Sequence, residues 1–574
     1  MHDLVIRNGH VVDGSGAPPR ITDVAVDAGR ITAVEGGIGR ARREIDAAGR
    51  LVLPGWVDIH THYDGQATWD AELAPSSWHG VTTAVFGNCG VGFAPVRPGS
   101  APYLINLMEG VEDIPGTVLA QGMDFRWESF PEYLDALAAT PRTMDLGAQV
   151  PHSALRFYVM GERGADHAQV PTAAEIETMG RLLQEALAAG ALGFSTSRTT
   201  KHRAADGRPT PSLSAGEPEL HGLAQAMRRA GRGVLQVNSD FGPGEFEILA
   251  AASELSGRPL SVLLLQSDHA PDLWRQTLSQ IHAARRDGLR VNGQIGSRPI
   301  GLVMGLETSM HPLGARPAWR EIADLPPAGR VARLRADASL RERLINEPLV
   351  RNDVLAQMIE RALPKVFRLT EPLDYEPDPA TALVAQAARR GCHPLALALD
   401  WMLADDGKGL LLYPFENYAA GNLDVVREML LDEATICGLS DGGAHVGLIC
   451  DASSPTTLLT HWARDRSRGP GLPLERLVKK QTRDTALAYG LTDRGLIAPG
   501  LRADINVVDF DRLRARLPQV VYDLPAGGKR VLQRAQGYDH TFVAGVETFR
   551  DGEPTGERPG RLLRAAAMDP AGRH

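Results

Sequence analysis

The middle of the chain alternates between two patterns of apolar residues. Over 219–229, 246–255 and 273–284 they recur at the three- and four-residue spacing of an amphipathic helix, and a short continuous apolar run follows each stretch. Another such helix is expected to begin at a capping box, Thr172 to Glu175, and to end near Gly190. Strands separated by helical crossovers form parallel sheets. The pattern therefore predicts an α/β fold, a (β/α)₈ barrel of the TIM type.

Eight apolar runs supply the predicted barrel strands: 51–59, 81–88, 145–150, 191–196, 234–238, 260–266, 289–295 and 435–440. The alternative is an open doubly wound sheet, which would place a glycine fingerprint after its first strand. His60-Thr61-His62 stands there instead, so the barrel is the favoured interpretation.

Both chain ends show short apolar runs that are typical of β-hairpins. Leu4 to Ile6 and Val11 to Val12 flank Asn8-Gly9, and two further runs flank Ala28 to Arg30. Similar runs return at 503–508, 530–532, 540–543 and 546–549. We expect both ends to build one small β-sandwich domain, formed by 1–53 and 497–574, around a barrel domain at 54–496. Helical and proline-rich residues 297–434 form a predicted insertion between strands seven and eight, a candidate lid.

Composition narrows the class of partner. With 43% hydrophobic residues, 574 residues can bury a large core, and a net charge of −9 leaves no basic surface for nucleic acid or an anionic membrane. The four cysteines are too few and too scattered for a disulfide framework, and no apolar run is long enough to span a membrane. We expect a cytoplasmic protein that acts on a small molecule. A homo-oligomer is compatible with such a protein, but the sequence does not show which surface would form the interface between subunits.

The strongest chemical signal follows the first predicted strand. Side chains alternate between the two faces of a strand, so His60 and His62 point to the same side at its C-terminal end. Two imidazoles on one side are a common way to hold a metal ion. Asp58 and Asp64 flank the pair. We interpret His60 and His62 as metal ligands.

Other strand ends add candidates, because the functional side chains of a barrel gather at the C-terminal ends of its strands. The second run ends in Cys89, between glycines, and a thiolate is a good zinc ligand. The eighth places Asp441 after a buried strand and His445 on the turn beyond. Asp441 could bind the metal and move a proton between water and a leaving nitrogen.

Several motifs together resemble the amidohydrolase superfamily, in its D-aminoacylase or N-acyl-D-amino-acid deacylase branch. They are His60-Thr61-His62, the segment around Gly87-Asn88-Cys89-Gly90, GALGFSTS, the SDGG turn and PGLRADINVVD. The resemblance implies a zinc-dependent hydrolase in which water activated by the metal attacks an amide carbonyl. It also implies that His60, His62 and Cys89 are metal ligands, with Cys89 in the place of the carboxylated lysine of other branches, and that Asp441 is the catalytic acid and base.

The sequence departs from this family at the fifth and sixth strands, where the family places histidines. Asn238 occupies the fifth-strand position, and the sixth-strand histidine is lost or displaced to His269. Asn238 and His269 are therefore secondary candidates for ligands, and one zinc ion is favoured over two. The family's cations for a substrate carboxylate are also missing. Candidates for substrate binding are residues near other strand ends: His152, Arg198, Lys201, Arg298 and His445.

The sequence thus predicts a metal-dependent amidohydrolase that cleaves a non-peptide C–N bond, with an N-acyl (D-)amino acid or a related small amide as substrate. A cyclic-amide hydrolase of the hydantoinase kind normally has a lysine on the fourth strand, where Phe194-Ser195-Thr196 stands. A deaminase would have histidines on strands five and six. A barrel that has lost catalysis and acts as a binding protein is the alternative from another class.

Overall fold

The computed structural model describes residues 1–349 and 354–565. Its centre is a parallel sheet of eight strands in the order β17-β13-β12-β11-β10-β9-β8-β6. The two edge strands continue into short strands that pair with each other in parallel, β7 and β18, so the sheet curls into a barrel-like form. The strands are β6 (Trp56–Asp58), β7 (His60–Thr61), β8 (Val81–Phe86), β9 (Asp145–Pro151), β10 (Gly193–Arg198), β11 (Val234–Ser239), β12 (Leu260–Leu263), β13 (Val291–Gln294), β17 (Thr435–Ile436) and β18 (Leu439–Gly442).

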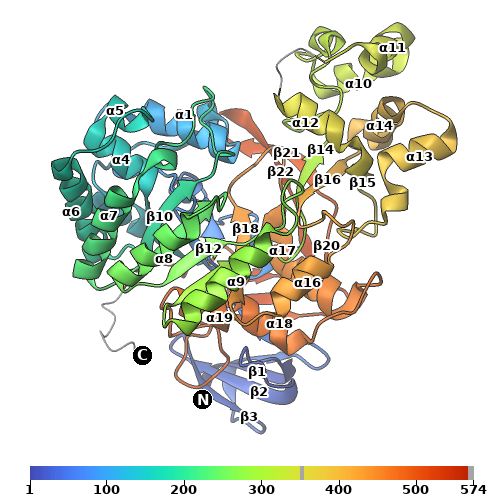
Figure 1. Ribbon diagram of the computed structural model, residues 1–574. Helices are drawn as coiled ribbons and strands as arrows, with labels where there is room; N and C mark the ends of the chain where they lie inside the picture. Colours follow the sequence, from blue (N-terminus) through green and yellow to red (C-terminus); the bar gives the residue numbers. More distant parts are fainter. Residues whose placement is uncertain (350–353, 566–574) are drawn as a thin grey trace.

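Helices connect successive strands and cover the outside of the sheet (Figure 1). Strands such as β8 and β9 are buried along their whole length, which explains why they appear in the sequence as continuous apolar runs. The connecting helices are α1 (Ala101–Glu112), α2 (Gly116–Gly122), α3 (Phe130–Ala138), α4 (His152–Met160), α5 (Glu162–Ala165), α6 (Ala173–Ala189), α7 (Glu217–Ala230), α8 (Glu245–Ser256), α9 (Leu273–Arg286) and α16 (Asp424–Leu431). The predicted capping box is confirmed, since Thr172 and Glu175 exchange hydrogen bonds at the start of α6, which ends at a left-handed Gly190. Within the described residues, every helix is too short or too polar to cross a membrane.

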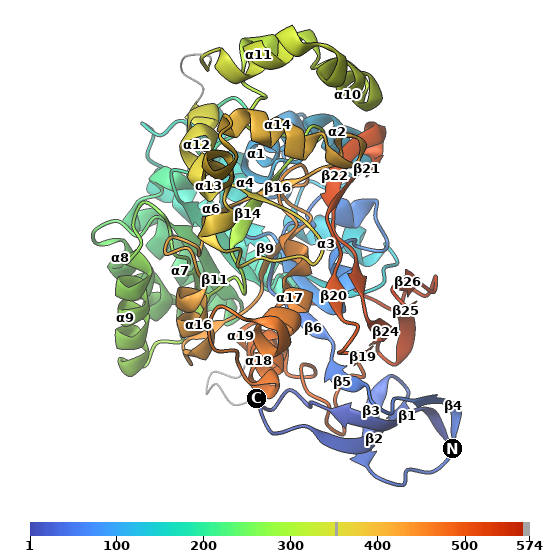
Figure 2. The same cartoon turned by 90° about the vertical axis from the view of Figure 1, so that its right-hand side faces the viewer.

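Both chain ends enter one mixed sheet of nine strands, so the predicted β-sandwich takes the form of a single sheet. The N-terminal strands lie at the base of the molecule in Figures 1 and 2, beside β19 and β24. The sheet consists of β1 (His2–Val11), β2 (Arg20–Asp27), β3 (Arg30–Glu35), β4 (Ala41–Asp46), β5 (Leu51–Pro54), β19 (Ile505–Val508), β24 (Tyr538–Val543), β25 (Val546–Arg550) and β26 (Glu553–Pro554).

Three details of the predicted strands are wrong. The Asn8-Gly9 pair is no hairpin turn but lies at a register shift within the continuous strand β1, where Asn8 has a positive φ. The run 51–59 is divided, because β5 pairs with β1 and β19 while β6 belongs to the barrel. Residues 530–532 lie outside the terminal sheet, in β22 (Gly528–Leu532), which pairs with β21 (Gln519–Leu524). An apolar run shows that a strand forms but does not specify its partner.

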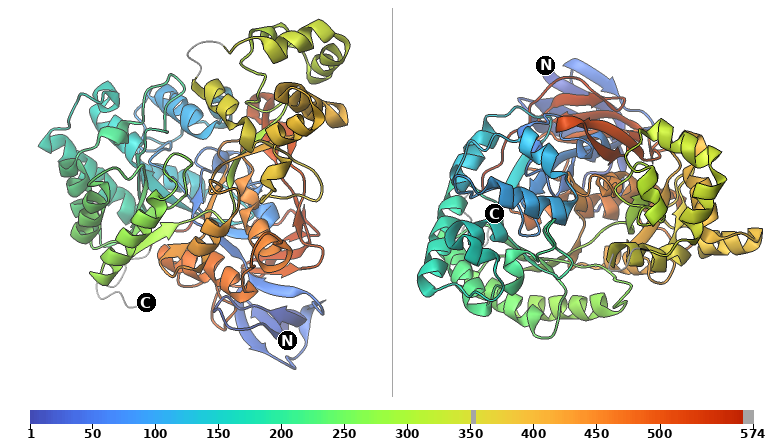
Figure 3. Two further views of the ribbon diagram at one scale, coloured as in Figure 1. Left: turned by 45° about the vertical axis from the view of Figure 1, so that its right-hand side comes forward. Right: turned by 90° about the horizontal axis from the view of Figure 1, so that it is seen from above.

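The segment between β13 and β17 holds a small sheet and a helical lobe that projects from the barrel, as the view from above in Figure 3 shows. The sheet has the order β14-β16-β15, formed by β14 (Ile300–Met304), β15 (Phe367–Arg368) and β16 (Leu411–Glu416). The helices are α10 (Pro327–Ala336), α11 (Ala338–Asn346), α12 (Val354–Ala362), α13 (Leu383–Arg390), α14 (Pro394–Met402) and α15 (Ala404–Gly407). After β18 the chain forms α17 (Ser454–Thr460), α18 (Leu474–Gln481) and α19 (Arg483–Ala488), and later the short strands β20 (Arg514–Ala515) and β23 (Ala535–Gln536). The domain boundaries and the role of the insertion as a lid stay predictions.

Candidate metal centre

Four predicted side chains meet at the C-terminal end of the barrel. Nε2 of His60 lies 3.3 Å from Sγ of Cys89 and 3.4 Å from Oδ1 of Asp441. The same Oδ1 lies 3.5 Å from Nε2 of His62. One ligand atom from each of His60, His62 and Cys89 falls within 4.8 Å of the others, and all three residues are buried. The pairing of β7 with β18 brings Asp441 beside the two histidines, from the other end of the barrel sheet.

Groups outside this cluster orient both imidazoles. Nδ1 of His60 lies 2.8 Å from Oε1 of Gln294, an acceptor, so Nδ1 carries the proton and Nε2 keeps its lone pair. Nδ1 of His62 lies 3.3 Å from Oε1 of Glu112, the last residue of α1. Both rings therefore turn Nε2 toward Cys89 and Asp441. Such outer partners normally orient histidine ligands in metal sites.

The turn that carries Cys89 is shaped by glycine and held by the barrel interior. Cys89 has a φ of 55°, and Gly87 and Gly90 also have positive φ. A Cβ on Gly87 would lie 2.3 Å from a carbonyl oxygen of Gln149, so no other residue fits there. Gly90 N–H donates to Oγ of Ser195 at 3.0 Å. Ser195 lies on the fourth barrel strand, where the hydantoinase alternative would require a lysine.

Three buried glutamines on alternate strands form a floor under the cluster. Gln149 on β9 donates to Oδ1 of Asn88 at 2.7 Å, and Gln236 on β11 accepts the N–H of Cys89 at 2.9 Å. Gln294 on β13 contacts His60, as described above. Side chains from alternate strands fill one layer of a barrel interior. This layer is polar, and it holds the metal-binding residues from below.

The charges of the cluster favour a cation at its centre. Burial would raise the pKa of Asp441, but the hydrogen bond with His62 and the neighbouring His60 and His62 rings outweigh it and hold that pKa below its ordinary value. Burial would lower the pKa of His62, but Glu112 and Asp441 raise it well above its ordinary value. Burial raises the pKa of Glu112 to about 7 and lowers that of His60 to about 4. The site thus stabilises positive charge between His62, Glu112 and Asp441.

These residues fit a zinc ion. Bonds of about 2.0 to 2.3 Å at tetrahedral angles place neighbouring ligand atoms about 3.3 to 3.6 Å apart. The separations of 3.3, 3.4 and 3.5 Å match three of the six edges of such a tetrahedron, and the ligand atoms of His60, His62 and Cys89 all lie within 4.8 Å of one another. Two imidazoles, a thiolate and a carboxylate are also ligand types that zinc prefers.

The secondary candidates occupy different places. Nδ2 of Asn238 lies 3.7 Å from Sγ of Cys89, next to the cluster. His269 is exposed and lies outside the group of convergent ligands. Nε2 of His445 lies 3.5 Å from Oε2 of Glu112, and the His445 N–H donates to the Glu112 carbonyl. Burial lowers the pKa of His445 to about 4.

The other predicted substrate-binding residues already have partners in the structure. His152 is buried between Thr196 and Glu219, at 2.9 and 3.1 Å. The three cations make ion pairs, Arg198 with Glu245, Lys201 with Glu416 and Arg298 with Asp451, and Arg298 also stacks on Tyr375. Of the three cations, Lys201 is the most exposed, at 58%. Their roles in substrate binding stay predictions.

Three residues of the site escaped the sequence reasoning. Glu112 ends a helix that the apolar pattern did not single out, and Gln294 is a neutral residue at the end of β13. His202 lies on the loop after β10, and its Nε2 is 3.2 Å from Nδ2 of Asn238. A search for histidines within six residues of the end of each predicted strand would have found His202, but no such rule finds Glu112 or Gln294.

Glu112→Gln is expected to weaken zinc binding by about 10- to 100-fold while the fold is retained, because the variant keeps the shape beside His62 but removes the charge. Competition with a chromophoric chelator measures the zinc affinity, and thermal unfolding monitors the fold. Glu109→Gln, on the same helix and less buried, is the matched control. Equal zinc affinities of the two variants and the wild type would show that Glu112 does not support His62.

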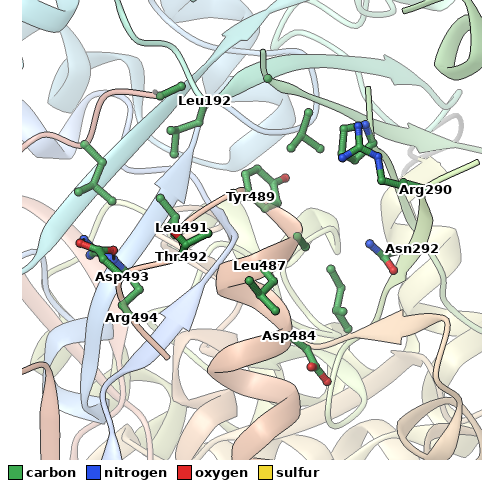
Figure 4. A pocket seen from close by; sticks show the side chains of 18 of the residues that line it. Leu192, Arg290, Asn292, Asp484, Leu487, Tyr489, Leu491, Thr492, Asp493 and Arg494 are labelled. Atoms are coloured by element: carbon green, nitrogen blue, oxygen red, sulfur yellow. Dashed lines mark hydrogen bonds and ion pairs between the residues drawn. The ribbon is translucent and has the colours of Figure 1, made fainter. Parts of the chain in front are cut away.

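A cavity of about 790 Å³ lies at the opposite end of the barrel. Its lining includes Leu192, Val234, Pro259, Asn292 and Thr435, which stand at the starts of their strands. Figure 4 shows its side chains, among them Tyr489, whose hydroxyl accepts a hydrogen bond from Gln294 at 3.3 Å. In barrel enzymes the N-terminal end of the strands contributes to stability and not to catalysis. The residues that line this cavity also do not include His60, His62 or Cys89. The chemistry therefore belongs to the C-terminal end.

Residues 43–554 match the family model described as "Amidohydrolase family". The chain belongs to the amidohydrolase family. This amidohydrolase is 27% identical to the D-aminoacylase of Alcaligenes xylosoxydans xylosoxydans over 98% of both chains. It is 28% identical to an uncharacterised protein of Mycobacterium tuberculosis, over 99% of this chain and 97% of that protein.

Solved structures agree with this assignment. A crystal structure of D-aminoacylase matches the amidohydrolase with a TM-score of 0.64 and 25% identity, over 98% of this chain and 100% of that one. An N-acyl-D-glutamate deacylase from Bordetella bronchiseptica, complexed with zinc and a phosphonate inhibitor, matches with the same values. The predicted resemblance to the D-aminoacylase and N-acyl-D-amino-acid deacylase branch is confirmed, because its members are among the relatives that match this chain over nearly its full length.

Proposed function

We propose that the protein is a zinc-dependent amidohydrolase that cleaves a non-peptide C–N bond, with an N-acyl (D-)amino acid or a related small amide as substrate. The convergence of His60, His62, Cys89 and Asp441 within hydrogen-bonding distances carries the proposal. The D-aminoacylase and the deacylases among its relatives act on such amides, as their names state. One zinc ion, with His60, His62 and Cys89 as ligands and Asp441 beside the position left open for water, is the simplest occupant of the cluster.

In the proposed reaction the residues of the chain hold the reactants and move one proton. A zinc ion in the cluster would lower the pKa of a water molecule to about 7 and polarise the amide carbonyl. Asp441, which is ionised at neutral pH, accepts a proton from the attacking water while the oxygen of that water bonds to the carbonyl carbon. Asp441 then donates this proton to the nitrogen as the C–N bond breaks, which yields a carboxylic acid and an amine.

The surroundings of Asp441 suit this role. Asp441 borders a cavity of about 20 Å³, which also touches Arg530 and Leu532. A space of this size holds about one water molecule. Asp58 lies next to the cluster, where its carboxylate accepts hydrogen bonds from Ser440 Oγ and from His60 N–H. These contacts hold β7 and β18 in register around the reacting groups.

The test combines zinc analysis with a substrate screen on the wild-type protein. We expect about one or more zinc ions per chain and release of amine from at least one N-acetyl amino acid in panels of D and L enantiomers. Hydrolysis of simple uncharged amides alone would support the amidohydrolase but refute the amino-acid substrate. Bound zinc without hydrolysis of any amide would contradict the proposal and favour a binding protein.

A further inference from the structure

A second cavity, of about 370 Å³, lies between the insertion and the β21-β22 hairpin. The chain from the end of β14 to α12 contributes His311, Trp319 and Ile359 to its lining, and the hairpin contributes Lys529. None of the four residues of the metal cluster lines it. Ligand cavities commonly measure about 300 to 1,000 Å³ and combine apolar walls with a few polar groups. This cavity therefore has the size and the mixed lining of a site for a small molecule.

Two cations line the cavity without a carboxylate partner. Nζ of Lys529 donates to the carbonyl oxygen of Glu307 at 2.5 Å. The guanidinium of Arg330 donates to backbone carbonyls of the surrounding turns, among them that of Ala323 at 2.8 Å. Within the part of the chain that the structure describes, neither cation forms an ion pair. The carbonyls satisfy hydrogen bonds but leave both positive charges without a counter-ion.

The carboxylates that act on Lys529 are hydrogen-bonded to other groups. Asp113 and Glu307 both raise the pKa of Lys529 through their charges, but less than burial lowers it. Oδ2 of Asp113 accepts the N–H of Gly447 at 3.2 Å, and Oε2 of Glu307 accepts the hydroxyl of Tyr522 at 2.6 Å. These contacts keep both carboxylates out of ion-pair distance of the ammonium group.

The two cations also repel each other. Burial and the charge of Arg330 lower the pKa of Lys529 below its ordinary value. In the cavity at the opposite end of the barrel, by contrast, Lys479 pairs with Asp484 at 2.9 Å. An anion between Arg330 and Lys529 would relieve their repulsion, whereas the other cavity already holds its counter-ion.

His311 adds a neutral hydrogen-bond donor to the same cavity. Its side chain is buried, with only 6% of the residue exposed. Burial and the charges of Arg330 and Lys529 lower its pKa to about 3, so the ring is neutral at pH 7. Nδ1 accepts the N–H of Leu313 at 3.3 Å, which leaves the proton of the neutral ring on Nε2. Among the described residues, this Nε2–H has no hydrogen-bond acceptor.

Trp319 forms an apolar wall beside these donors. Its ring meets that of His311 edge to face, with centroids 4.2 Å apart, and the guanidinium carbon of Arg330 lies 5.5 Å from its centroid. Met310 and Ile359 also line the cavity. An apolar group that leaves water for such a wall gains free energy in proportion to its buried area. Inorganic anions have no such group.

We propose that this cavity binds a small organic carboxylate, with its anionic group held by Lys529 and His311 in the field of Arg330 and its apolar body packed against Trp319. Ser309, which also lines the cavity, donates its N–H to the carbonyl of Gly447 at 3.1 Å. The site therefore adjoins the turn that follows Asp441 but is separate from the metal cluster.

Benzoate binding, measured by isothermal titration calorimetry on the full chain, tests the site. Lys529→Met removes the charge but keeps an apolar side chain, and it is expected to weaken benzoate binding about tenfold or more. The matched control, Lys479→Met, removes the lysine of the other cavity and is expected to keep the wild-type affinity. Absence of benzoate binding to the wild type, or an unchanged affinity in Lys529→Met, would overturn the proposal.

Two analogues of benzoate test the chemical class of the ligand. Benzamide has the same ring without the charge, and phosphate has the charge without the ring. Each is expected to bind about tenfold more weakly than benzoate or worse, since each loses one of the two interactions. Phosphate binding as tight as that of benzoate would show a site for inorganic anions, and equal binding of benzamide would show that the cations play no part. Either result refutes the organic carboxylate.

A cavity-filling variant keeps the test decisive if Lys529→Met does not fold. Ala315 lines the cavity and is half-buried, so Ala315→Leu narrows the cavity without a change of charge. It is expected to weaken benzoate binding and to leave the thermal unfolding temperature nearly unchanged. A folded Ala315→Leu chain with the wild-type affinity would contradict the proposed position of the ligand.

A carboxylate could instead bind to a metal ion in the cluster. The His60→Ala/His62→Ala chain removes this alternative and is expected to keep the wild-type affinity for benzoate. Loss of binding in that chain would place benzoate at the cluster and refute the cavity site. Because the measurement requires no hydrolysis, failure of the proposed amidohydrolase activity does not affect it.

Discussion

Replacing His60 and His62 together with alanine is expected to remove bound zinc and to reduce amide hydrolysis to the uncatalysed rate. The double variant loses two of the three ligands His60, His62 and Cys89, and catalytic zinc needs three protein ligands. Without the metal, the pKa of water returns from about 7 to about 15.7, so hydroxide is no longer supplied at neutral pH. Elemental analysis and an amine-release assay measure the two effects.

The matched control for this variant removes two histidines from the protein surface, His269→Ala and His282→Ala. His269 is exposed, and His282 makes only a partly exposed ion pair with Asp432, which contributes little to stability. The control is expected to keep the zinc ion and the hydrolytic rate. A His60/His62 variant that still hydrolyses amides at the wild-type rate would show that the cluster is not the active site.

Asp441→Asn is expected to lower kcat by about 10²- to 10⁴-fold while zinc stays bound. The size follows from the usual contribution of a general acid–base group. Zinc is retained because His60, His62 and Cys89 still supply three ligands. Asparagine cannot accept the proton of water, and it removes the charge that the His62 and His60 rings stabilise at this position.

Steady-state kinetics and zinc analysis on the same preparation separate catalysis from binding. Asp268→Asn is the control, since Asp268 is a partly exposed carboxylate that pairs with Lys365 and makes no contact with the cluster. Its kcat should be roughly that of the wild type. If Asp441→Asn kept a kcat within tenfold of the wild type, another group would be the proton carrier, and Glu112 would be the next carboxylate to test.

Local patterns predicted those parts of the site whose residues are neighbours in sequence. The alternation of a strand places His60 and His62 on one side, and the glycines around Cys89 mark a sharp turn at a strand end. Both signals depend on backbone geometry over a few residues, and that geometry follows directly from residue type. The prediction that Asn8-Gly9 forms a hairpin turn failed because the same local backbone geometry also suits a bulge in a continuous strand.

The sequence by itself determined the succession of strands and helices, the HxH pair, the cysteine turn and the family. Only the tertiary structure decided which residues surround them: Gln294 contacts His60 across 234 positions, and Glu112 reaches His62 from the end of a helix. The pairing of β7 with β18, which closes the sheet, likewise places Asp441 beside both histidines. Their partners are chosen by packing between distant segments, for which a local pattern of apolar and polar residues carries no information.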